Sequence, residues 1–169
     1  MAKKPDKRSE IPPRDSDNDN RRLINEIDQG VLLDLKNTIN YAGHPKHKRN
    51  PHVFGLPRYN GKRGDETLCD KHAGFTKAQM AGIALLLQRG LAAELVGERI
   101  IWSIADDGWM FEARLTNRDT NEFHGYPVRP SEAIAELVFE RFERWARRNG
   151  GTQEKLAALR CAERYGFKP

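Results

Sequence analysis

The sequence predicts an α+β protein, in which a small antiparallel meander of three to four strands packs with one face against helices. Three observations predict this class. Apolar residues recur at helical spacing over residues 21–39, alternate with a period of two over 99–128, and recur at helical spacing again over 131–165. Residues 21–169 are therefore expected to form a single α+β domain, and residues 1–20 a disordered tail.

The tail is rich in Pro, Asp and Lys, and Ile11 is its one large aliphatic residue after the initiator Met. Such a segment cannot bury enough apolar surface to offset the conformational entropy lost on ordering. From Arg21 a helix is expected, with Gly30 weakening its middle by about 1 kcal/mol relative to Ala. Its apolar residues follow at spacings of three and four: Leu23, Ile24, Ile27, Val31, Leu32, Leu35 and Ile39.

Residues 41–75 are expected to form a long irregular loop, because Gly and Pro recur along them. A loop of this length inside a compact domain is usually either functional or disordered. A second helix is predicted from Thr76, since Gln79 follows three residues later as in a capping box. That helix should end near Gly90 or Gly97.

The sheet is expected over about residues 99–128. Three segments there alternate as strands do, and turn-forming residues (Asp107-Gly108 in the first connection, Asn117 to Asn121 in the second) separate them, which favours an antiparallel meander. The three segments are RIIWSIAD (99–106), MFEARLTN (110–117) and EFHGYPV (122–128).

Two helices are expected at the C-terminus, over residues 131–165. Ser131 is the expected cap of the first, and Asn149-Gly150-Gly151 ends it. Thr152 then begins a last helix, which runs to about Tyr165. The first of the two is amphipathic, with an apolar side formed by Ile134, Leu137, Val138, Phe142 and Trp145.

The composition indicates a protein of the cytoplasm with an anionic partner. It is 38% hydrophobic and 31% charged, with a mean hydropathy of -0.77, a net charge of +5 and a pI of about 9.3. This balance favours a polyanion such as nucleic acid, and no apolar run approaches the roughly 20 residues that cross a membrane. Cys69 and Cys161 are too few for a disulfide framework. The chain has no P-loop, Rossmann glycine motif, HExxH helix or GxSxG elbow.

The segment from Tyr41 to Gly64 contains no Asp or Glu, yet it holds three of the five histidines and six Lys and Arg residues. Its cations should keep His47 neutral, so that this imidazole can act as a general base on a ribose 2′-hydroxyl. Lys46 would stabilise the charge that develops on the phosphate. The expected substrate-binding residues of this segment are Lys48, Arg49, Arg58 and Tyr59, the last by stacking on a base. The alternative is a solvated basic surface.

His124 and Tyr126 are the expected partners of His47. Two residues apart on one strand, they point to the same face, and Gly125 between them lets a substrate approach. His124 would complete an acid–base pair, and Tyr126 would donate to a phosphate oxygen. Further polar groups on the meander are Ser103 and Arg114 as phosphate donors and Glu112 as a base or an ion-pair partner.

A second interpretation of the same segment is a structural zinc site. His44 and His47 form one pair with a two-residue spacer, and Cys69 and His72 form another. Two such pairs can complete a tetrahedral zinc site. Against this, Pro45 lies inside the first pair and the neighbouring cations repel a divalent ion.

The Lys46-His47 pair, followed by Phe54-Gly55 within HVFGL and then by a small sheet, resembles the barnase–EndoU–colicin–RelE class of metal-independent ribonucleases, which includes colicin D-like toxin domains. The resemblance covers roughly residues 40–128. It implies a helical layer on a four-stranded antiparallel sheet, cleavage of tRNA or mRNA to a 2′,3′-cyclic phosphate, and an immunity or antitoxin protein as partner. It also implies that His47 is the acid–base residue and Lys46 the phosphate-stabilising cation. The long loop around the pair and the helices after the sheet depart from the class.

The leading hypothesis is therefore an RNA-binding, toxin-like endoribonuclease that uses no cofactor, prefers RNA to DNA and acts in the cytoplasm away from membranes. One alternative is a non-catalytic nucleic-acid-binding or regulatory module that uses the same loop. Another is a zinc-stabilised interaction domain.

Overall fold

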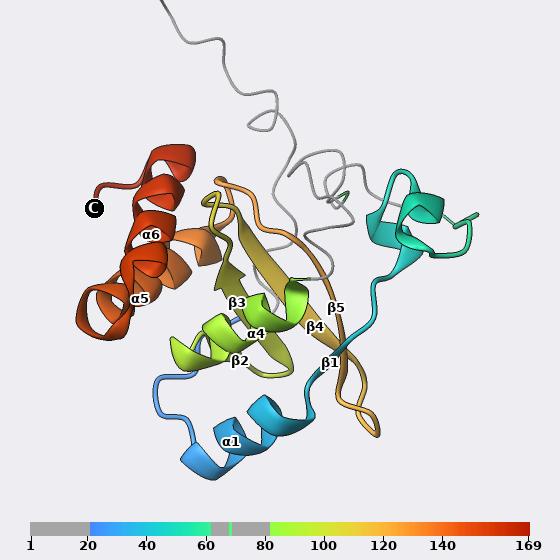
Figure 1. Ribbon diagram of the computed structural model, residues 1–169, viewed down its shortest axis with the longest axis horizontal. Helices are drawn as coiled ribbons and strands as arrows, with labels where there is room; N and C mark the ends of the chain where they lie inside the picture. Colours follow the sequence, from blue (N-terminus) through green and yellow to red (C-terminus); the bar gives the residue numbers. More distant parts are fainter. Residues whose placement is uncertain (1–20, 62–67, 69–81) are drawn as a thin grey trace, which may run out of the picture.

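The computed structural model describes residues 21–61, 68 and 82–169, and these form an α+β fold, as predicted (Figure 1). The described residues contain four α-helices and a mixed sheet of five strands in the order β1-β5-β4-β3-β2. The expected number of three to four strands was therefore wrong. The predicted tail, residues 1–20, lies outside the described residues.

The middle of the sheet is the predicted antiparallel meander, β3-β4-β5, to which a very short strand is added at each edge. The edge strand β1 runs parallel to β5, and β2 runs antiparallel to β3. Each edge strand has two residues, too few to show any alternation, so the sequence pattern could not reveal them. The strands are β1 (Asn40–Tyr41), β2 (Val96–Gly97), β3 (Ile100–Ile104), β4 (Met110–Asn117) and β5 (Glu122–Pro127).

The first helix is shorter than predicted. Helix α1 spans Gln29–Thr38, and the residues from Arg21 to Asp28 are irregular despite their helical spacing. Two contacts explain this result. The Asp28 carboxylate accepts from Val31 N at 3.0 Å and so caps the helix, and Ile24 N donates to Val96 O at 2.8 Å, which ties the preceding segment to β2.

Helices cover both faces of the sheet rather than the single face that was expected. Helices α4 (Ile83–Ala92) and α1 pack on the side of Ile101, whereas α5 (Ala133–Asn149) and α6 (Thr152–Tyr165) pack on the side of Trp102 (Figure 1). Since neighbouring residues of a strand point to opposite faces, β3 is buried on both. The predicted start of this second helix, Thr76, lies outside the described residues, and α4 as described begins at Ile83.

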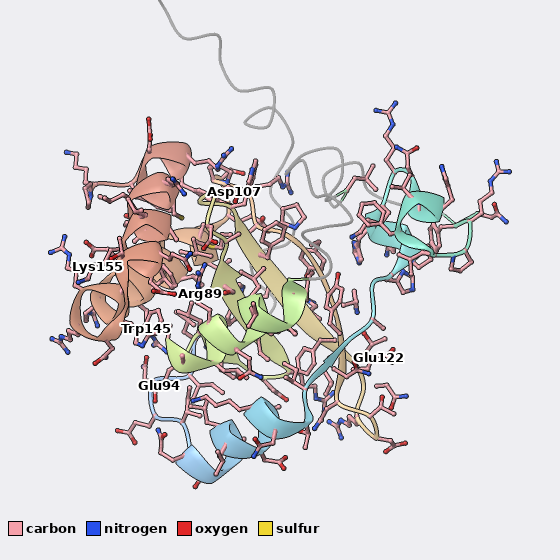
Figure 2. The ribbon with its side chains drawn as sticks, viewed as in Figure 1. Arg89, Glu94, Asp107, Glu122, Trp145 and Lys155 are labelled. Atoms are coloured by element: carbon pink, nitrogen blue, oxygen red, sulfur yellow. The ribbon has the colours of Figure 1, made fainter. Side chains whose placement is uncertain are left out.

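Helix α4 lies very close to β3 because Gly90 has no side chain. A Cβ atom on Gly90 would stand 2.2 Å from Trp102 O. Arg89, the preceding residue, is labelled in Figure 2. It donates to Ile104 O at 2.8 Å and pairs with Asp106 at 2.7 Å, which joins α4 to the end of β3.

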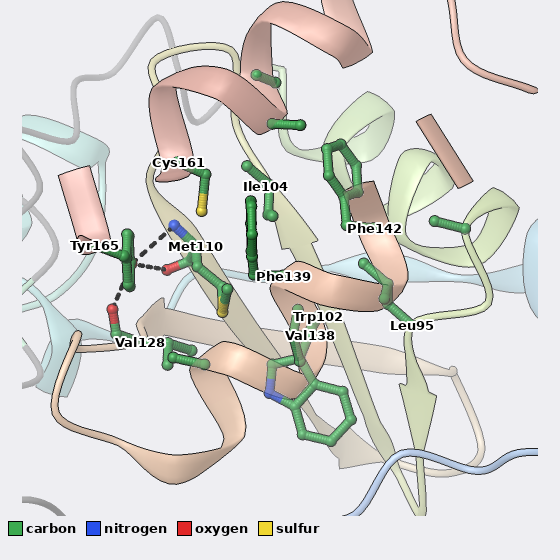
Figure 3. Packing of buried hydrophobic residues seen from close by; sticks show 14 of the residues in the cluster. Leu95, Trp102, Ile104, Met110, Val128, Val138, Phe139, Phe142, Cys161 and Tyr165 are labelled. Atoms are coloured by element: carbon green, nitrogen blue, oxygen red, sulfur yellow. Dashed lines mark hydrogen bonds between the residues drawn. The ribbon is translucent and has the colours of Figure 1, made fainter. Parts of the chain in front are cut away.

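On the other face, Tyr165 at the end of α6 links two strands (Figure 3). Its hydroxyl accepts from Met110 N at 3.0 Å and donates to Val128 O at 2.6 Å. Complete burial raises the pKa of Tyr165 well above its ordinary value. Cys161 lies beside it in the same core, and burial raises the pKa of that thiol to about 12, so it stays protonated. None of the helices in the described ranges has the length and apolar composition to cross a membrane.

Candidate functional site

The basic segment reaches the sheet through the parallel pairing of β1 with β5. Asn40 lies opposite Glu122 and Tyr41 opposite Phe123, and Ala42 N donates to Phe123 O at 2.9 Å. The chain then leaves the sheet as the irregular loop that was predicted, and β5 continues alongside. The loop forms two short 3-10 helices, η2 (Pro45–His47) and η3 (Pro51–Phe54), next to β5 (Figure 1). We refer to residues 43–61 as the histidine loop.

The first turn of the histidine loop is held by His44. Its Nδ1 atom accepts a hydrogen bond from Lys46 N at 3.1 Å, which caps η2. Pro45 occupies the first position of η2, and Lys48 N donates to Pro45 O at 3.2 Å. This turn directs His47 inward, where only 5% of it is exposed.

Three imidazoles and one phenol gather where the loop meets β5. The rings of His47 and His124 are stacked, with centroids 5.1 Å apart and planes at 13°. The ring of Tyr126 lies 5.0 Å from that of His47, and His44 lies 5.7 Å from His124. The structure thus brings together the residues that the sequence proposed as a group, while their catalytic roles stay predictions.

The environment of His124 favours a neutral imidazole. Burial is the largest cause that lowers its pKa to about 4, and the charges of His44, Arg114, Lys46 and Lys48 act in the same direction. Its Nδ1 atom shares a hydrogen bond of 2.6 Å with Thr116 Oγ1. His124 is therefore uncharged at neutral pH and can accept a proton. This electrostatic effect was expected for the neighbouring His47.

Glu112 lies at the base of the site, and none of its side chain is exposed. Its Oε2 atom accepts from Arg21 Nε and Trp102 Nε1, each at 2.9 Å, and its Oε1 atom accepts from Arg114 Nε at 2.8 Å and from the Tyr126 hydroxyl. Burial would raise the pKa of Glu112, but these donors, above all Arg21, hold it below its ordinary value. Of the two expected roles for Glu112, base or ion-pair partner, the contacts match the second.

One of these contacts uses the hydroxyl proton of Tyr126. The sequence suggested that this proton would donate to a phosphate oxygen, but it donates to Glu112. The phenol ring is therefore held beside His47 by its bond to Glu112.

Arg21 is a residue of this site that the sequence did not identify. It pairs with Glu112 at 2.8 Å and with Glu132 at 3.0 Å, and so connects β4 to the start of α5. Glu132 also accepts from Arg129 N at 2.6 Å. No local motif marks Arg21 in the sequence, because its partners stand 91 and 111 positions away (112 − 21 and 132 − 21).

The expected phosphate donors on the sheet differ in position. Arg114 lies opposite His124 in the β4–β5 ladder and is 31% exposed, which leaves it accessible to a substrate. Ser103 lies on the other face of the sheet, buried under α4 next to a cavity of about 30 Å³, and its Oγ has no hydrogen-bond partner among the described residues. The structure therefore does not bring Ser103 to the imidazoles.

The expected substrate-binding residues of the histidine loop differ in exposure. Arg49 and Arg58 are exposed, and the Tyr59 ring lies 6.0 Å from that of His44. Lys46 is half-buried and close enough to influence the charge of His124. Lys48, by contrast, is fully buried with Nζ 5.3 Å from the Phe54 ring centroid, so it faces the interior of the loop rather than a substrate.

The zinc interpretation involves two residues that the structure describes, His44 and His47, and two that lie outside the described residues, Cys69 and His72. Within the described part of the chain, no three His, Cys, Asp or Glu side chains form a group that could hold a metal ion. The zinc site stays a prediction.

Comparisons of this chain with family models, with curated proteins and with solved structures gave no match. The likeness to metal-independent ribonucleases thus continues to rest on Lys46-His47 and Phe54-Gly55.

Proposed function

We propose that this protein is an RNA-binding, metal-independent endoribonuclease that acts in the cytoplasm, with His47 and His124 as its proton-transferring pair. The observation that carries the proposal is the stacking of a buried His47 on His124, an imidazole kept neutral by its surroundings. Two imidazoles at one site can remove one proton and supply another, which is what phosphodiester transesterification requires.

In this reaction the ribose 2′-oxygen forms a bond to phosphorus while the bond between phosphorus and the 5′-oxygen breaks. His124 is assigned as the base that takes the 2′-hydroxyl proton. A base must be unprotonated, and the pKa of about 4 keeps His124 unprotonated near pH 7, although it also lowers the basicity of the ring. His47 then gives a proton to the leaving 5′-oxygen. The products are a 2′,3′-cyclic phosphate and a free 5′-hydroxyl. This assignment exchanges the roles expected from the sequence, in which His47 was the base.

Cations at the site hold the phosphate and stabilise the charge that accumulates on its oxygens. Arg114 and Lys46 are the two that combine accessibility with proximity to His124. Arg49 and Arg58 are exposed on the same loop and suit the neighbouring phosphates of a strand, and Tyr59 suits stacking on a splayed base.

The test is cleavage of total tRNA by the purified protein in the presence of EDTA. Wild type should give discrete fragments that end in cyclic phosphate. His47→Ala and His124→Ala should abolish cleavage but still bind RNA, whereas the matched control His52→Ala, an exposed histidine of the same loop, should cleave as wild type does. A toxicity assay in a heterologous host should show the same ranking.

RNA binding that falls steeply with salt, with no fragments, would instead identify a non-catalytic module. About one zinc per chain, with unfolding on chelation, would identify the zinc-stabilised domain.

A further inference from the structure

Glu112 accepts hydrogen bonds from four side chains, three of which come from other parts of the chain. The donors are Arg21 from the segment before α1, Trp102 from β3, Arg114 from β4 and Tyr126 from β5. A carboxylate has about four lone-pair positions, and here all of them are used. Glu112 is also fully buried, so it neither touches a substrate nor accepts a proton from one.

Two of the four donors face the imidazole pair. Tyr126 packs against His47 with ring centroids 5.0 Å apart, and Arg114 stands opposite His124 in the ladder, with its Cζ 5.9 Å from the Tyr126 ring centroid. Arg114 uses only Nε in its hydrogen bond to Glu112. Its two terminal amino groups make no hydrogen bond to the described residues, although only 31% of the side chain is exposed. A planar guanidinium held at Nε presents those two groups as a fixed fork, which matches two oxygens of a phosphate.

We propose that Glu112 is a positioning residue that aims the free edge of the Arg114 guanidinium, with Tyr126 as its backing wall, at a phosphodiester lying against His47 and His124. The inference rests on the proposed function. It adds that Arg114 recognises the scissile phosphate and that Glu112 fixes Arg114 in place. Glu112 acts through Arg114 and does not meet the substrate.

Arg21 makes this arrangement feasible inside the protein. A buried, ionised carboxylate needs a positively charged partner. If Arg114 were the only partner of Glu112, it would have to turn its terminal amino groups toward Glu112 as well. Arg21 supplies the second positive charge from the opposite side, at 2.8 Å from Oε2. Arg114 can then bind Glu112 through one nitrogen and keep the remaining two for a ligand.

Glu112→Gln tests the inference, with Glu132→Gln as a matched control. Both substitutions remove one fully buried negative charge that pairs with Arg21, but it is Glu112 that accepts the hydrogen bonds of Arg114 and Tyr126. A glutamine at position 112 has only one acceptor oxygen, so it cannot serve Arg21 and Trp102 on one side and Arg114 and Tyr126 on the other.

The assay is steady-state cleavage of a short RNA, with circular dichroism confirming that each variant is folded. We expect Glu112→Gln to lower kcat by about 10–100-fold with little change in KM, because misplacing a group that acts on the transition state by about 1 Å can cost on the order of 100-fold. Glu132→Gln should retain the wild-type kcat. Equal losses in both variants would show a purely structural role and overturn the inference.

Arg114→Lys covers the case in which Glu112→Gln does not fold. Lysine keeps the charge at this partly exposed position but lacks the fork, so it cannot bind Glu112 and a phosphate in fixed directions. We expect a similar loss of kcat, and full activity in Arg114→Lys would overturn the inference. If wild type leaves RNA intact, the proposed function fails and this inference with it. If Glu112→Gln and Arg114→Lys both cleave RNA as well as wild type does, only the inference fails.

Discussion

Replacing Arg21 by methionine should markedly lower the urea concentration at which the protein unfolds. The Arg21 side chain is 2% exposed and lies between two fully buried carboxylates, Glu112 and Glu132. Methionine fills a similar length with apolar atoms but brings no charge and no donor. Both carboxylates then lose their shared positive partner.

Removing one member of a buried ion pair typically costs about 3–5 kcal/mol, because the remaining charge stays in a poorly hydrated place. We expect a loss near the lower end, about 3 kcal/mol, since neither carboxylate is left alone. Glu112 keeps its bonds from Trp102, Arg114 and Tyr126, and Glu132 keeps the one from Arg129 N.

Equilibrium unfolding in urea measures this change, and Arg22→Met is the matched control. Arg22 carries the same charge one position along but is exposed, so its replacement should change the free energy of unfolding by no more than about 0.5 kcal/mol.

The difference in the free energy of unfolding between wild type and Arg21→Met should also decrease as the pH is lowered. The pKa of Glu112 is lowered in the folded state, so its stabilising contribution is present above the ordinary glutamate pKa of about 4.3 and is lost as pH falls through the folded pKa. A loss below about 1 kcal/mol at neutral pH would refute the buried-network argument.

Two further changes test the fold and the electrostatics of the site. The pKa of His124 is lowered to about 4 on folding, so the unfolded chain binds more protons between pH 6.5 and pH 4 and stability must fall as the pH drops through this window. In urea titrations, His124→Asn should reduce this pH-dependent loss of unfolding free energy by about 1–3 kcal/mol, a range that allows for solvent around a partly exposed ring. If the free energy of unfolding of His124→Asn depends on pH as that of wild type does, the lowered pKa of His124 is refuted. Gly90→Ala should destabilise the protein by about 1–3 kcal/mol in the same assay, because the new Cβ would stand 2.2 Å from Trp102 O. Ala ordinarily favours a helix over Gly by about 1 kcal/mol, so stabilisation would show that α4 can move away from β3.

In the second half of the fold the sequence predicted the elements well, because local signals there are strong and agree with one another. The expected cap Ser131 was wrong, since the N-cap of α5 is Glu132. The strand Met110–Asn117 and the helix Thr152–Tyr165 have the predicted bounds. Alternation defined the strand, which follows a turn containing Gly108 with φ 88°. Gly166, with φ 75°, is the C-cap that ends the helix.

The prediction failed where long-range contacts outweigh local preference. Residues 21–28 have helical spacing, but Arg21 is drawn into the buried network and Ile24 is bonded to β2. The same reason explains the expected single helical layer. The face of β4 that carries Glu112 and Arg114 holds a buried charge network beside the layer of α5 and α6, and its partners cannot be recognised from local sequence.

For the site, the sequence could indicate residue types but not their mutual orientation. His47, His124 and Tyr126 were identified by their chemistry and by strand alternation, and the structure places them together. The role of Glu112 as a common acceptor could not be predicted, because it depends on donors from three other elements.

The backbone attachment of the histidine loop to the sheet is the parallel ladder of β1 and β5, which has only two residues in each strand yet joins positions 40 and 122. Closing so large a loop is entropically costly, while so short a ladder contributes few hydrogen bonds. We therefore expect the loop to detach by local opening at a lower free energy than global unfolding, which amide hydrogen exchange at Ala42 would report. A strand of RNA bound to both the histidine loop and β5 would oppose this opening. The protection of the Ala42 amide from exchange should therefore rise with the fraction of protein that has RNA bound.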